Sequence, residues 1–311
     1  MTSNERYDVL IIGGGPAGIA ASIWCSDLGL SSILVDSGPE LGGQMQWIYN
    51  SINNYPGVSV KNGMEMGDRF IESIDLANQC VLLNSKVLAL DATKVEAFLS
   101  DKTTLSARYA IVATGLRRRK LGIPGEQEFI GRGVLESGAR DRAIAAGKRV
   151  AIIGGGDAAI ENALILSEFA DRVFVIHRRN ELRARKEFAD RVHRVGNVEI
   201  VLDRRVTSIE GGDVLERIYV DDANGSRSSL EIDLVLIRVG YQPNSEILRG
   251  QVEIDEHGYV TTDRFGQTSA PSVFAVGDVA NQVSPTIATA VGTSAMAVKS
   301  IYSLISGDSR V

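Results

Sequence analysis

A short β-rich run at positions 7–12, apolar from Val9 onward, is followed by a glycine cluster and a second apolar run. No charge occurs between Val9 and Cys25, a span of 17 residues. Glycines and Pro16 interrupt this span near its start, and it is short for a membrane-spanning helix. The pattern therefore predicts a strand, a tight turn and a helix. The same succession recurs at 149–170.

The first glycine cluster has the spacing G-x-G-x-x-G, with Gly13, Gly15 and Gly18. In a dinucleotide-binding unit these glycines allow a tight turn, a close approach of the backbone to a pyrophosphate, and helix–strand contact. The helix N-terminus supplies free N–H groups for the phosphates. A second apolar run at 32–35 ends in Asp36, an acid placed to accept hydrogen bonds from ribose hydroxyls. A Rossmann-like dinucleotide site is predicted here.

The second unit has the same turn, as Gly154, Gly156 and Ala159, but a different strand end. The apolar run 173–176 is followed by a basic cluster, Arg178, Arg179 and Arg183. Guanidinium groups bind a 2′-phosphate through charge-assisted hydrogen bonds, whereas an acid would repel it. The cluster predicts NADPH rather than NADH. A solvated basic face is the alternative; it accounts for the cations at 185–194 better than for the first two arginines.

Two dinucleotide units in one chain indicate electron relay between two cofactors, FAD in the first and NADPH in the second. Breaker-rich segments follow the apolar runs at 109–112 and 234–237. We therefore expect an α/β protein with two Rossmann-like domains, in which an NADPH domain, 118–245, is inserted into a discontinuous FAD domain, 1–117 and 246–311.

The C-terminal part adds a strand at 272–276, then Gly277 and Asp278, and a helix from about 286 to 306. Asp278 is placed to bind a sugar-alcohol hydroxyl of the flavin chain. The helix start, Thr286, Ile287 and Ala288, offers N–H groups to the anionic edge of a reduced flavin. A turn acid and a helix cap explain the same residues equally well.

Composition narrows the function further. The chain has 311 residues, 44% of them hydrophobic, and a net charge of −6, which is typical of a two-domain globular protein and excludes a general nucleic-acid binder. Two cysteines and three histidines give no basis for a disulfide framework or a metal centre. The N-terminus lacks the pattern of a secretory signal, so we expect a soluble cytoplasmic protein.

The order of several motifs resembles the low-molecular-weight thioredoxin reductase family. These are GGGPAG, Leu41-Gly42-Gly43-Gln44, Asn54-Tyr55-Pro56-Gly57, Ala113-Thr114-Gly115, GGGDAA, HRRxxxR and Val276-Gly277-Asp278. The resemblance implies a flavoprotein, usually a homodimer, whose inserted NADPH domain rotates relative to the FAD domain. It also implies that further positions line the FAD, with Asp278 on its ribityl chain: Gly42, Gly43, Gln44, Asn54, Thr114 and Gly115.

The chain departs from that family at its redox centre. Family members carry Cys-x-x-Cys before the second glycine motif, where this chain has Ser137 and Arg140 at the apparent cysteine positions. Neither can form or attack a disulfide, which excludes thioredoxin reduction by the family mechanism. Cys25 and Cys80 lie elsewhere, in apolar surroundings, and are predicted to be small buried residues.

Direct transfer of electrons to an external acceptor is the function that remains. Ferredoxin–NADP reductases of the thioredoxin-reductase-like type share this domain plan and lack the cysteine pair, so a ferredoxin or flavodoxin is the favoured partner. The run 117–120, with four basic residues, suits docking of an acidic protein or simply a solvated linker. A reductase of quinones or other small molecules, and a flavoprotein sensor without turnover, are the alternatives. We assign no catalytic residue.

Overall fold

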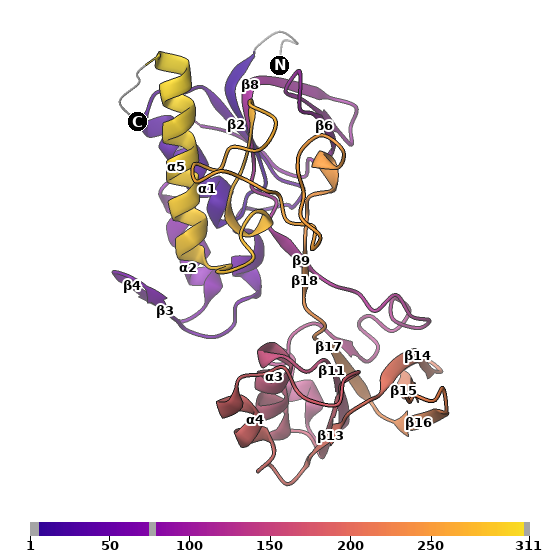
Figure 1. Cartoon of the computed structure of the whole chain (residues 1–311). Coiled ribbons are helices and arrows are strands. Elements are labelled where there is room, and N and C mark those ends of the chain that lie inside the picture. The colour runs from indigo at the N-terminus through magenta and orange to yellow at the C-terminus, as the bar shows by residue number, and fades with distance from the viewer. Residues whose placement is uncertain (1–5, 75–78, 308–311) are drawn as a thin grey trace. The chain divides into compact units, whose positions relative to one another are not determined.

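The computed structural model describes residues 6–74 and 79–307; the terminal residues discussed above, 1–5 and 308–311, lie outside this range. Two compact units form (Figure 1). The flanking unit contains the described residues up to Arg117 and from Gln242 onward, and the inserted unit is Arg118–Tyr241. The second boundary thus falls four residues before the 245 expected from the sequence. The reason is that Asn244 exchanges two hydrogen bonds with Thr114, of 2.7 and 2.8 Å.

The flanking unit is built on a seven-stranded sheet, in which the strands that carry the glycine turn and its neighbours are parallel. The order along the sheet is β5-β2-β1-β8-β7-β6, and β19 pairs with β8. The antiparallel pairs are β6 with β7 and β7 with β8. The strands are β1 (Tyr7–Ile12), β2 (Ser32–Val35), β5 (Cys80–Leu82), β6 (Val87–Asp91), β7 (Glu96–Leu99), β8 (Thr104–Val112) and β19 (Val273–Ala275).

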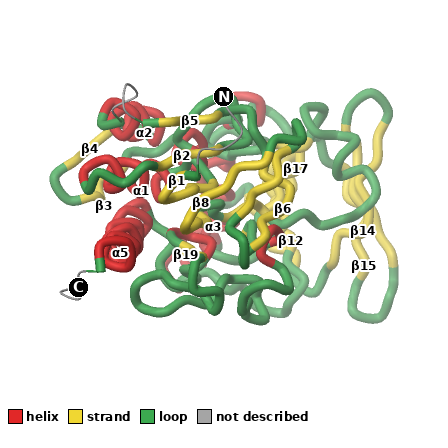
Figure 2. Tube along the Cα trace, turned by 90° about the horizontal axis from the view of Figure 1, so that it is seen from above, coloured by secondary structure: helices red, strands yellow, loops and turns green. Residues whose placement is uncertain are grey.

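The strand β1 is apolar from Val9 to Ile12 because both faces of the sheet are covered there. Val9 and Ile11 pack into the cluster formed with the helices, and Leu10 and Ile12 into the cluster on the other face, as the twofold repeat of a strand requires. The helices α1 and α5 lie side by side (Figures 1 and 2). The hydroxyl of Ser294 links them by donating to the Ala17 carbonyl at 2.8 Å. The helices are α1 (Pro16–Asp27), α2 (Gly63–Glu72) and α5 (Ile287–Ser306).

The inserted unit has a parallel five-stranded sheet with the order β10-β17-β11-β12-β13. Helices α3 and α4 cover one face, against Val150 and Ile152. A separate antiparallel sheet, β14-β15-β16, covers the other face, against Ala151 and Ile153. The elements are β10 (Val134–Leu135), β11 (Arg149–Ile153), α3 (Asp157–Ser167), β12 (Arg172–Ile176), α4 (Lys186–Val192), β13 (Val198–Val201), β14 (Arg205–Gly211), β15 (Leu215–Asp221), β16 (Arg227–Glu231) and β17 (Leu234–Ile237).

Short elements complete the chain. The chain crosses between the units at β9 (Leu116–Arg118) and β18 (Tyr241–Pro243), and these two strands pair with each other. A hairpin is formed by β3 (Ile52–Tyr55) and β4 (Val58–Val60). The 3-10 turns of the described residues are η1 (Gly43–Trp47), η2 (Arg142–Ala145), η3 (Glu246–Leu248) and η4 (Gly277–Val279). Among the described helices, none combines the length and the apolar character needed to cross a membrane.

Candidate functional site

The first glycine turn joins β1 to α1, and two of its glycines are required by close packing. A Cβ on Gly18 would lie 1.7 Å from the carbonyl oxygen of Gly13. Gly13 has a φ of +109°, and a Cβ there would lie 2.5 Å from the Ala113 carbonyl oxygen. Gly15 is different, because a Cβ on it would meet nothing within 4 Å. The backbone at Gly15 therefore borders open space that a diphosphate can approach closely.

The N-terminus of α1 has the properties of a phosphate-binding helix end. Gly15 is the N-cap, Pro16 opens the helix, no side chain caps its N–H groups, and the first turn holds no acid. The first-turn amides thus lack a side-chain acceptor, and the helix dipole adds a partial positive charge. Both properties fit the diphosphate of FAD.

Asp36 lies directly after β2, beside this turn. Its two carboxylate oxygens accept hydrogen bonds from the backbone amides of Gly14, at 2.5 Å, and Gly38, at 2.6 Å. These bonds hold the carboxylate at the strand end. Each oxygen has further lone pairs for a ribose hydroxyl.

The loop before η1 packs on the same turn. The amide of Gly42 donates to the Gly14 carbonyl at 2.8 Å, and a Cβ on Gly43 would lie 2.9 Å from the Cα of Gly15. The Gln44 side chain donates to the carbonyl of Leu116 at 3.1 Å, which brings it next to Gly115. The structure thus gathers these predicted FAD positions around one turn.

Three other predicted positions have structural roles or stand apart. The Thr114 hydroxyl donates to the Asn244 carbonyl, and the Thr286 hydroxyl caps α5 by accepting from the Thr289 amide at 3.2 Å. Both hydroxyls are therefore engaged in holding the fold. The amides of Ile287 and Ala288, in the first turn of α5, are candidate donors. Asn54 is exposed on β3, and its side chain makes no hydrogen bond with the described residues.

Asp278 is a half-buried carboxylate at the 3-10 turn η4, after β19. Within the described part of the chain, its side chain has no hydrogen bond or ion pair, and burial raises its pKa to about 6. A desolvated carboxylate of this kind gains from hydroxyl donors. This fits the ribityl chain of FAD. The preceding residue, Gly277, is held by a hydrogen bond from its amide to the Thr293 hydroxyl at 3.1 Å.

The second glycine turn, between β11 and α3, repeats the packing of the first. A Cβ on Gly154 would lie 2.2 Å from the Arg238 carbonyl oxygen and 3.2 Å from the Ala159 methyl. Gly156 is the N-cap of α3, and a Cβ there would meet nothing within 4 Å. The open side of this turn fits a second diphosphate.

The basic cluster after β12 separates into paired and unpaired cations. Arg178, Arg179 and Arg183 are exposed, and none of their guanidinium groups pairs with an acid among the described residues. By contrast, Arg185 pairs with Asp157 and Lys186 with Asp190, each at 2.7 Å. The three unpaired arginines lie in one loop beside the second glycine turn, because the Arg183 amide donates to the Gly155 carbonyl at 2.6 Å. They fit a 2′-phosphate.

His177 and Arg238, which the predicted site does not include, also lie at this edge of the sheet. The ring of His177 packs on Gly155, and its Nε2 atom is buried without a hydrogen-bond partner among the described residues. Burial and the charges of Arg179 and Arg178 lower its pKa, which disfavours the protonated ring. Arg238 directly follows β17. A polar residue immediately after a buried strand is the sequence signal that identifies both.

The segment at the missing cysteine positions is a salt-bridged turn. The guanidinium of Arg140 binds the Asp141 carboxylate at 2.6 Å and the Glu136 carboxylate at 2.8 Å. Asp141 also accepts from the amides of Ser137 and Glu136, at 3.0 Å each. Burial acts to raise the pKa of Asp141, but these hydrogen bonds and the charge of Arg140 outweigh it, and the pKa is lowered. The turn is thus held by ionic bonds and by hydrogen bonds from the backbone.

Both cysteines are free thiols in the flanking unit. Cys25 is buried in α1, and burial raises its pKa to about 12, so it remains protonated at physiological pH. Cys80 is half-buried at the start of β5.

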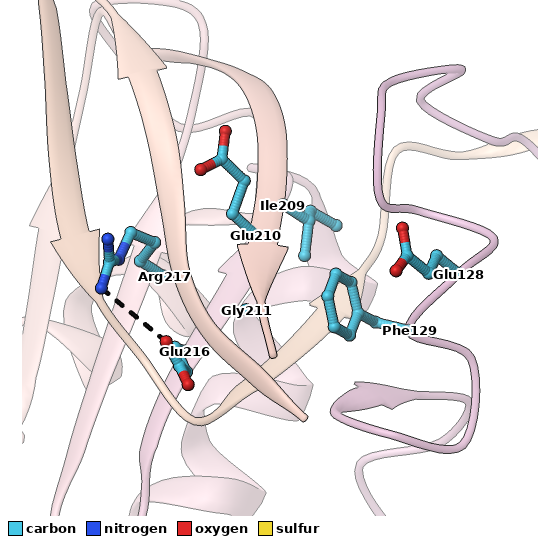
Figure 3. A pocket seen from close by; sticks show the side chains of 7 residues that line it. All are labelled: Glu128, Phe129, Ile209, Glu210, Gly211, Glu216 and Arg217. Carbon is cyan, nitrogen blue, oxygen red and sulfur yellow. Dashed lines mark ion pairs between the residues drawn. The ribbon is translucent and has the colours of Figure 1, made fainter. Parts of the chain in front are cut away.

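A pocket in the inserted unit is lined by residues outside its glycine turn (Figure 3). Glutamates and Arg217, which pairs with Glu216 at 3.7 Å, dominate its lining. The lining residues are Glu128, Phe129, Ile209, Glu210, Gly211, Glu216 and Arg217. None of them belongs to the predicted nucleotide positions, and an acidic lining repels phosphates.

The two kinds of glycine can be separated by alanine substitution. Gly18→Ala forces a Cβ against the Gly13 carbonyl and should lower the free energy of unfolding by at least about 2 kcal/mol. Gly15→Ala has room in the apoprotein and should change this free energy by less than about 1 kcal/mol. The same substitution should lower the affinity for FAD at least about tenfold, because the added methyl group occupies the space through which the diphosphate approaches the backbone. Denaturant unfolding of apoprotein and FAD titration measure these effects; equal destabilisation by both substitutions would contradict the assignment.

Asp278→Asn tests the desolvated carboxylate. Because the pKa of Asp278 in the fold, about 6, lies above its ordinary value of 3.8, the folded state binds the proton more tightly. Wild-type apoprotein should therefore lose stability as pH rises from about 4 to about 6. Apo Asp278→Asn should lack this loss and melt higher than wild type at pH 7–8. Its FAD affinity should fall about tenfold, through loss of charge-assisted bonds. Melting curves of apoprotein across this pH range give the first comparison, and an unchanged slope would refute it.

Arg178→Gln combined with Arg179→Gln tests the 2′-phosphate site. The kcat/KM ratio of NADPH to NADH should fall at least about tenfold, because charge-assisted hydrogen bonds to the phosphate are lost. Arg172→Gln, which removes an arginine paired with Glu199 at the other end of β12, is the matched control and should leave the ratio unchanged. Equal ratios in the double variant and wild type would place the 2′-phosphate elsewhere.

Comparison with known proteins agrees with this geometry. The family model for pyridine nucleotide-disulphide oxidoreductases matches residues 7–296. The chain is 33% identical over 300 residues to a thioredoxin reductase of Listeria innocua, which covers 96% of this chain and 93% of that protein. It is 28% identical over 309 residues to the 34.2 kDa protein in the rubredoxin operon of Clostridium pasteurianum, covering 99% and 100% of the two chains.

A solved structure shows the same likeness. The crystal structure of Lactococcus lactis thioredoxin reductase in its FR conformation superposes with a TM-score of 0.84 at 31% identity, covering 97% of this chain and all of that one. The chain thus belongs to the pyridine nucleotide-disulphide oxidoreductase family, among its thioredoxin-reductase-like members, which are FAD- and NADPH-dependent enzymes.

Proposed function

We propose that this chain is an FAD-dependent NADPH oxidoreductase that reduces an external acceptor directly, with no thiol relay. The observation that carries this proposal is that the inserted unit, residues 118–241, contains no cysteine. Thiol–disulfide exchange requires a thiolate as nucleophile and a second sulfur to close the disulfide. The hydroxyl of Ser137 and the guanidinium of Arg140 supply neither.

The two cysteines of the flanking unit do not replace the missing pair. Cys25 is a buried thiol in α1 whose high pKa keeps it protonated. Cys80 lies in β5, where its sulfur accepts a weak hydrogen bond from the Tyr7 hydroxyl at 3.9 Å. Neither is an exposed thiol of the kind that exchanges with disulfides.

The chain's own residues would bind and orient both coenzymes. The turn at Gly13–Gly18 and the α1 amides hold the FAD diphosphate, Asp36 the ribose hydroxyls, and Asp278 the ribityl hydroxyls. The second turn holds the NADPH diphosphate, and the loop 178–183 holds the 2′-phosphate. The first-turn amides of α5 stabilise negative charge placed before them. FAD, when bound, supplies a centre that takes up hydride and releases electrons in steps of one or two.

A small acidic redox protein, a ferredoxin or flavodoxin, is the proposed acceptor. Two observations favour it. One relative is described as a protein of a rubredoxin operon. The run 117–120 also keeps positive charge: Arg117 pairs with Glu246, but the exposed Arg119 and Lys120 donate to the neutral oxygens of Tyr241 and Gln127. Their uncompensated charges would attract an acidic partner. The proposal also includes a homodimer, as the resemblance implies, and a cytoplasmic location.

Rapid mixing of FAD-loaded enzyme with NADPH under anaerobic conditions tests the proposal. The flavin absorbance should bleach within seconds, and reduced enzyme should then be reoxidised by one class within a panel of ferredoxin, flavodoxin, quinones and small disulfides. When thioredoxin is the acceptor and a thiol-sensitive dye reports its reduction, the rate should not exceed that of a blank without the enzyme. Ser137→Ala should leave bleaching unchanged, because that hydroxyl takes no part in the transfer.

The outcomes distinguish the rival functions. Reoxidation by ferredoxin or flavodoxin alone supports the proposed partner, and reoxidation by quinones alone replaces it with a small-molecule reductase. A flavin that stays oxidised with NADPH would indicate a sensor without turnover. Turnover with thioredoxin would overturn the absence of a thiol relay.

A further inference from the structure

Two arginines of the inserted unit converge on one carbonyl oxygen at the end of its sheet. Arg238 follows β17, and its guanidinium donates to the Ile237 carbonyl at 2.8 Å and to the Glu136 carbonyl at 3.0 Å. The guanidinium of Arg118 donates to the same Glu136 oxygen. Glu136 directly follows β10. Both cations therefore lie where two neighbouring parallel strands end.

The acids beside this pair are bound to another cation. The carboxylates of Glu136 and Asp141 both bind Arg140, and Asp141 also accepts two backbone amides. In the part of the chain that the structure describes, no carboxylate forms an ion pair with Arg118 or Arg238. Two positive charges thus share one neutral oxygen.

This arrangement is unfavourable unless a negative group joins it. Burial and the charge of Arg118 lower the pKa of Arg238 to about 10, so the guanidinium is charged at pH 7 but poorly solvated. Arg238 alone links the ends of β17 and β10 through its two hydrogen bonds. The guanidinium of Arg118 adds electrostatic repulsion and does not strengthen that link. Two adjacent guanidinium groups are, however, well suited to binding an oxyanion.

The strand order places the pair relative to the nucleotide residues. Along β17-β11-β12, Arg238 follows the first strand, the glycine turn the second, and the 2′-phosphate cluster the third. The Arg238 carbonyl touches the turn, because a Cβ on Gly154 would lie 2.2 Å from it. A dinucleotide extended across these carboxyl ends, with its adenosine phosphate over β12, would bring its nicotinamide half toward β17 and β10.

We propose that Arg238 and Arg118 form an oxyanion site that binds the phosphate of the nicotinamide half of NADP(H). This inference rests on the proposed function only in taking the inserted unit to bind NADP(H). It adds two guanidinium groups to the diphosphate site at the second glycine turn, apart from the 2′-phosphate site at Arg178 and Arg179.

Calorimetric binding to FAD-loaded protein tests the inference without turnover. The probes are NADP⁺ and 2′,5′-ADP, which keeps the 2′-phosphate and adenosine but lacks the nicotinamide half. Arg238→Met should lower the affinity for NADP⁺ about tenfold. It should leave the affinity for 2′,5′-ADP within about twofold of the wild-type value. Arg118→Met should weaken NADP⁺ in the same direction, and Arg238→Lys, which keeps the charge, should fall between wild type and Arg238→Met.

Arg132→Met is the matched control. Arg132 belongs to the same unit and also donates to carbonyl oxygens, those of Glu128 and Asp213, but it lies away from the strand ends that carry the nucleotide residues. It should leave both affinities unchanged. Melting temperatures confirm that each variant is folded, and if Arg238→Met unfolds, Arg118→Met and Arg238→Lys decide.

Each outcome has one meaning. An unchanged NADP⁺ affinity in the folded Arg238→Met and Arg118→Met variants overturns the inference, even if the KM of an anionic acceptor rises. Equal weakening of 2′,5′-ADP and NADP⁺ also overturns it, because the effect is then structural. If wild-type protein binds NADP⁺ but its flavin is not reduced by NADPH, the proposed function is refuted. This binding site then still stands.

Discussion

Close packing at the turn between a strand and the helix that follows it is the constraint on which both nucleotide units depend. In the flanking unit, Gly18 of α1 lies so near the Gly13 carbonyl that no side chain fits between them. In the inserted unit, a Cβ on Gly154, the counterpart of Gly13, would lie 2.2 Å from the Arg238 carbonyl oxygen, while Ala159 occupies the position of Gly18. This packing sets the helix N-terminus over the carboxyl end of the sheet, where its amides and dipole face an anion. The surrounding loops then pack on the turn so formed.

Charge distinguishes two otherwise similar turns. A single carboxylate, Asp36, stands beside the first and is held by backbone amides. Beside the second stand three arginines that pair with no acid in the described structure, while neighbouring cations are neutralised by acids of their own. The charges at the two strand ends therefore differ as the predicted ribose and 2′-phosphate sites require. The segment of Ser137 and Arg140 follows a third pattern, because Arg140 binds its acids in an ionic turn.

Much of the fold could be predicted from the sequence because its parallel strands are short apolar runs that end in glycine turns. The strands β1 and β11 and the helices that follow them were located within a few residues in this way. The antiparallel sheet β14-β15-β16 was not predicted, since its strands are half-exposed and rich in charge; β16, for example, has one half-buried residue, Leu230, among exposed ones.

The candidate site could be predicted only in part. Glycine spacing and strand-end charges identify the turns, Asp36 and the arginine cluster, whose roles in binding stay predictions. Hydrogen-bond partners across the fold cannot be deduced from spacing. Thr114 and Thr286 have hydroxyls that suit a cofactor, yet the structure uses one to hold Asn244 and the other to cap α5. Arg238 and Arg118 are 120 residues apart in sequence, so only the folded sheet shows that they share an oxygen.

The pairing of β9 with β18 has a consequence for how such a protein can be assembled from modules. The chain leaves the flanking unit and returns to it on neighbouring, hydrogen-bonded strands, so the two cut points of the insertion lie about 5 Å apart. The whole NADP-binding unit can thus be removed or exchanged at this strand pair without a change in the strand order of the seven-stranded sheet. Recombination there would change the electron donor and leave the connectivity of the FAD-binding unit intact.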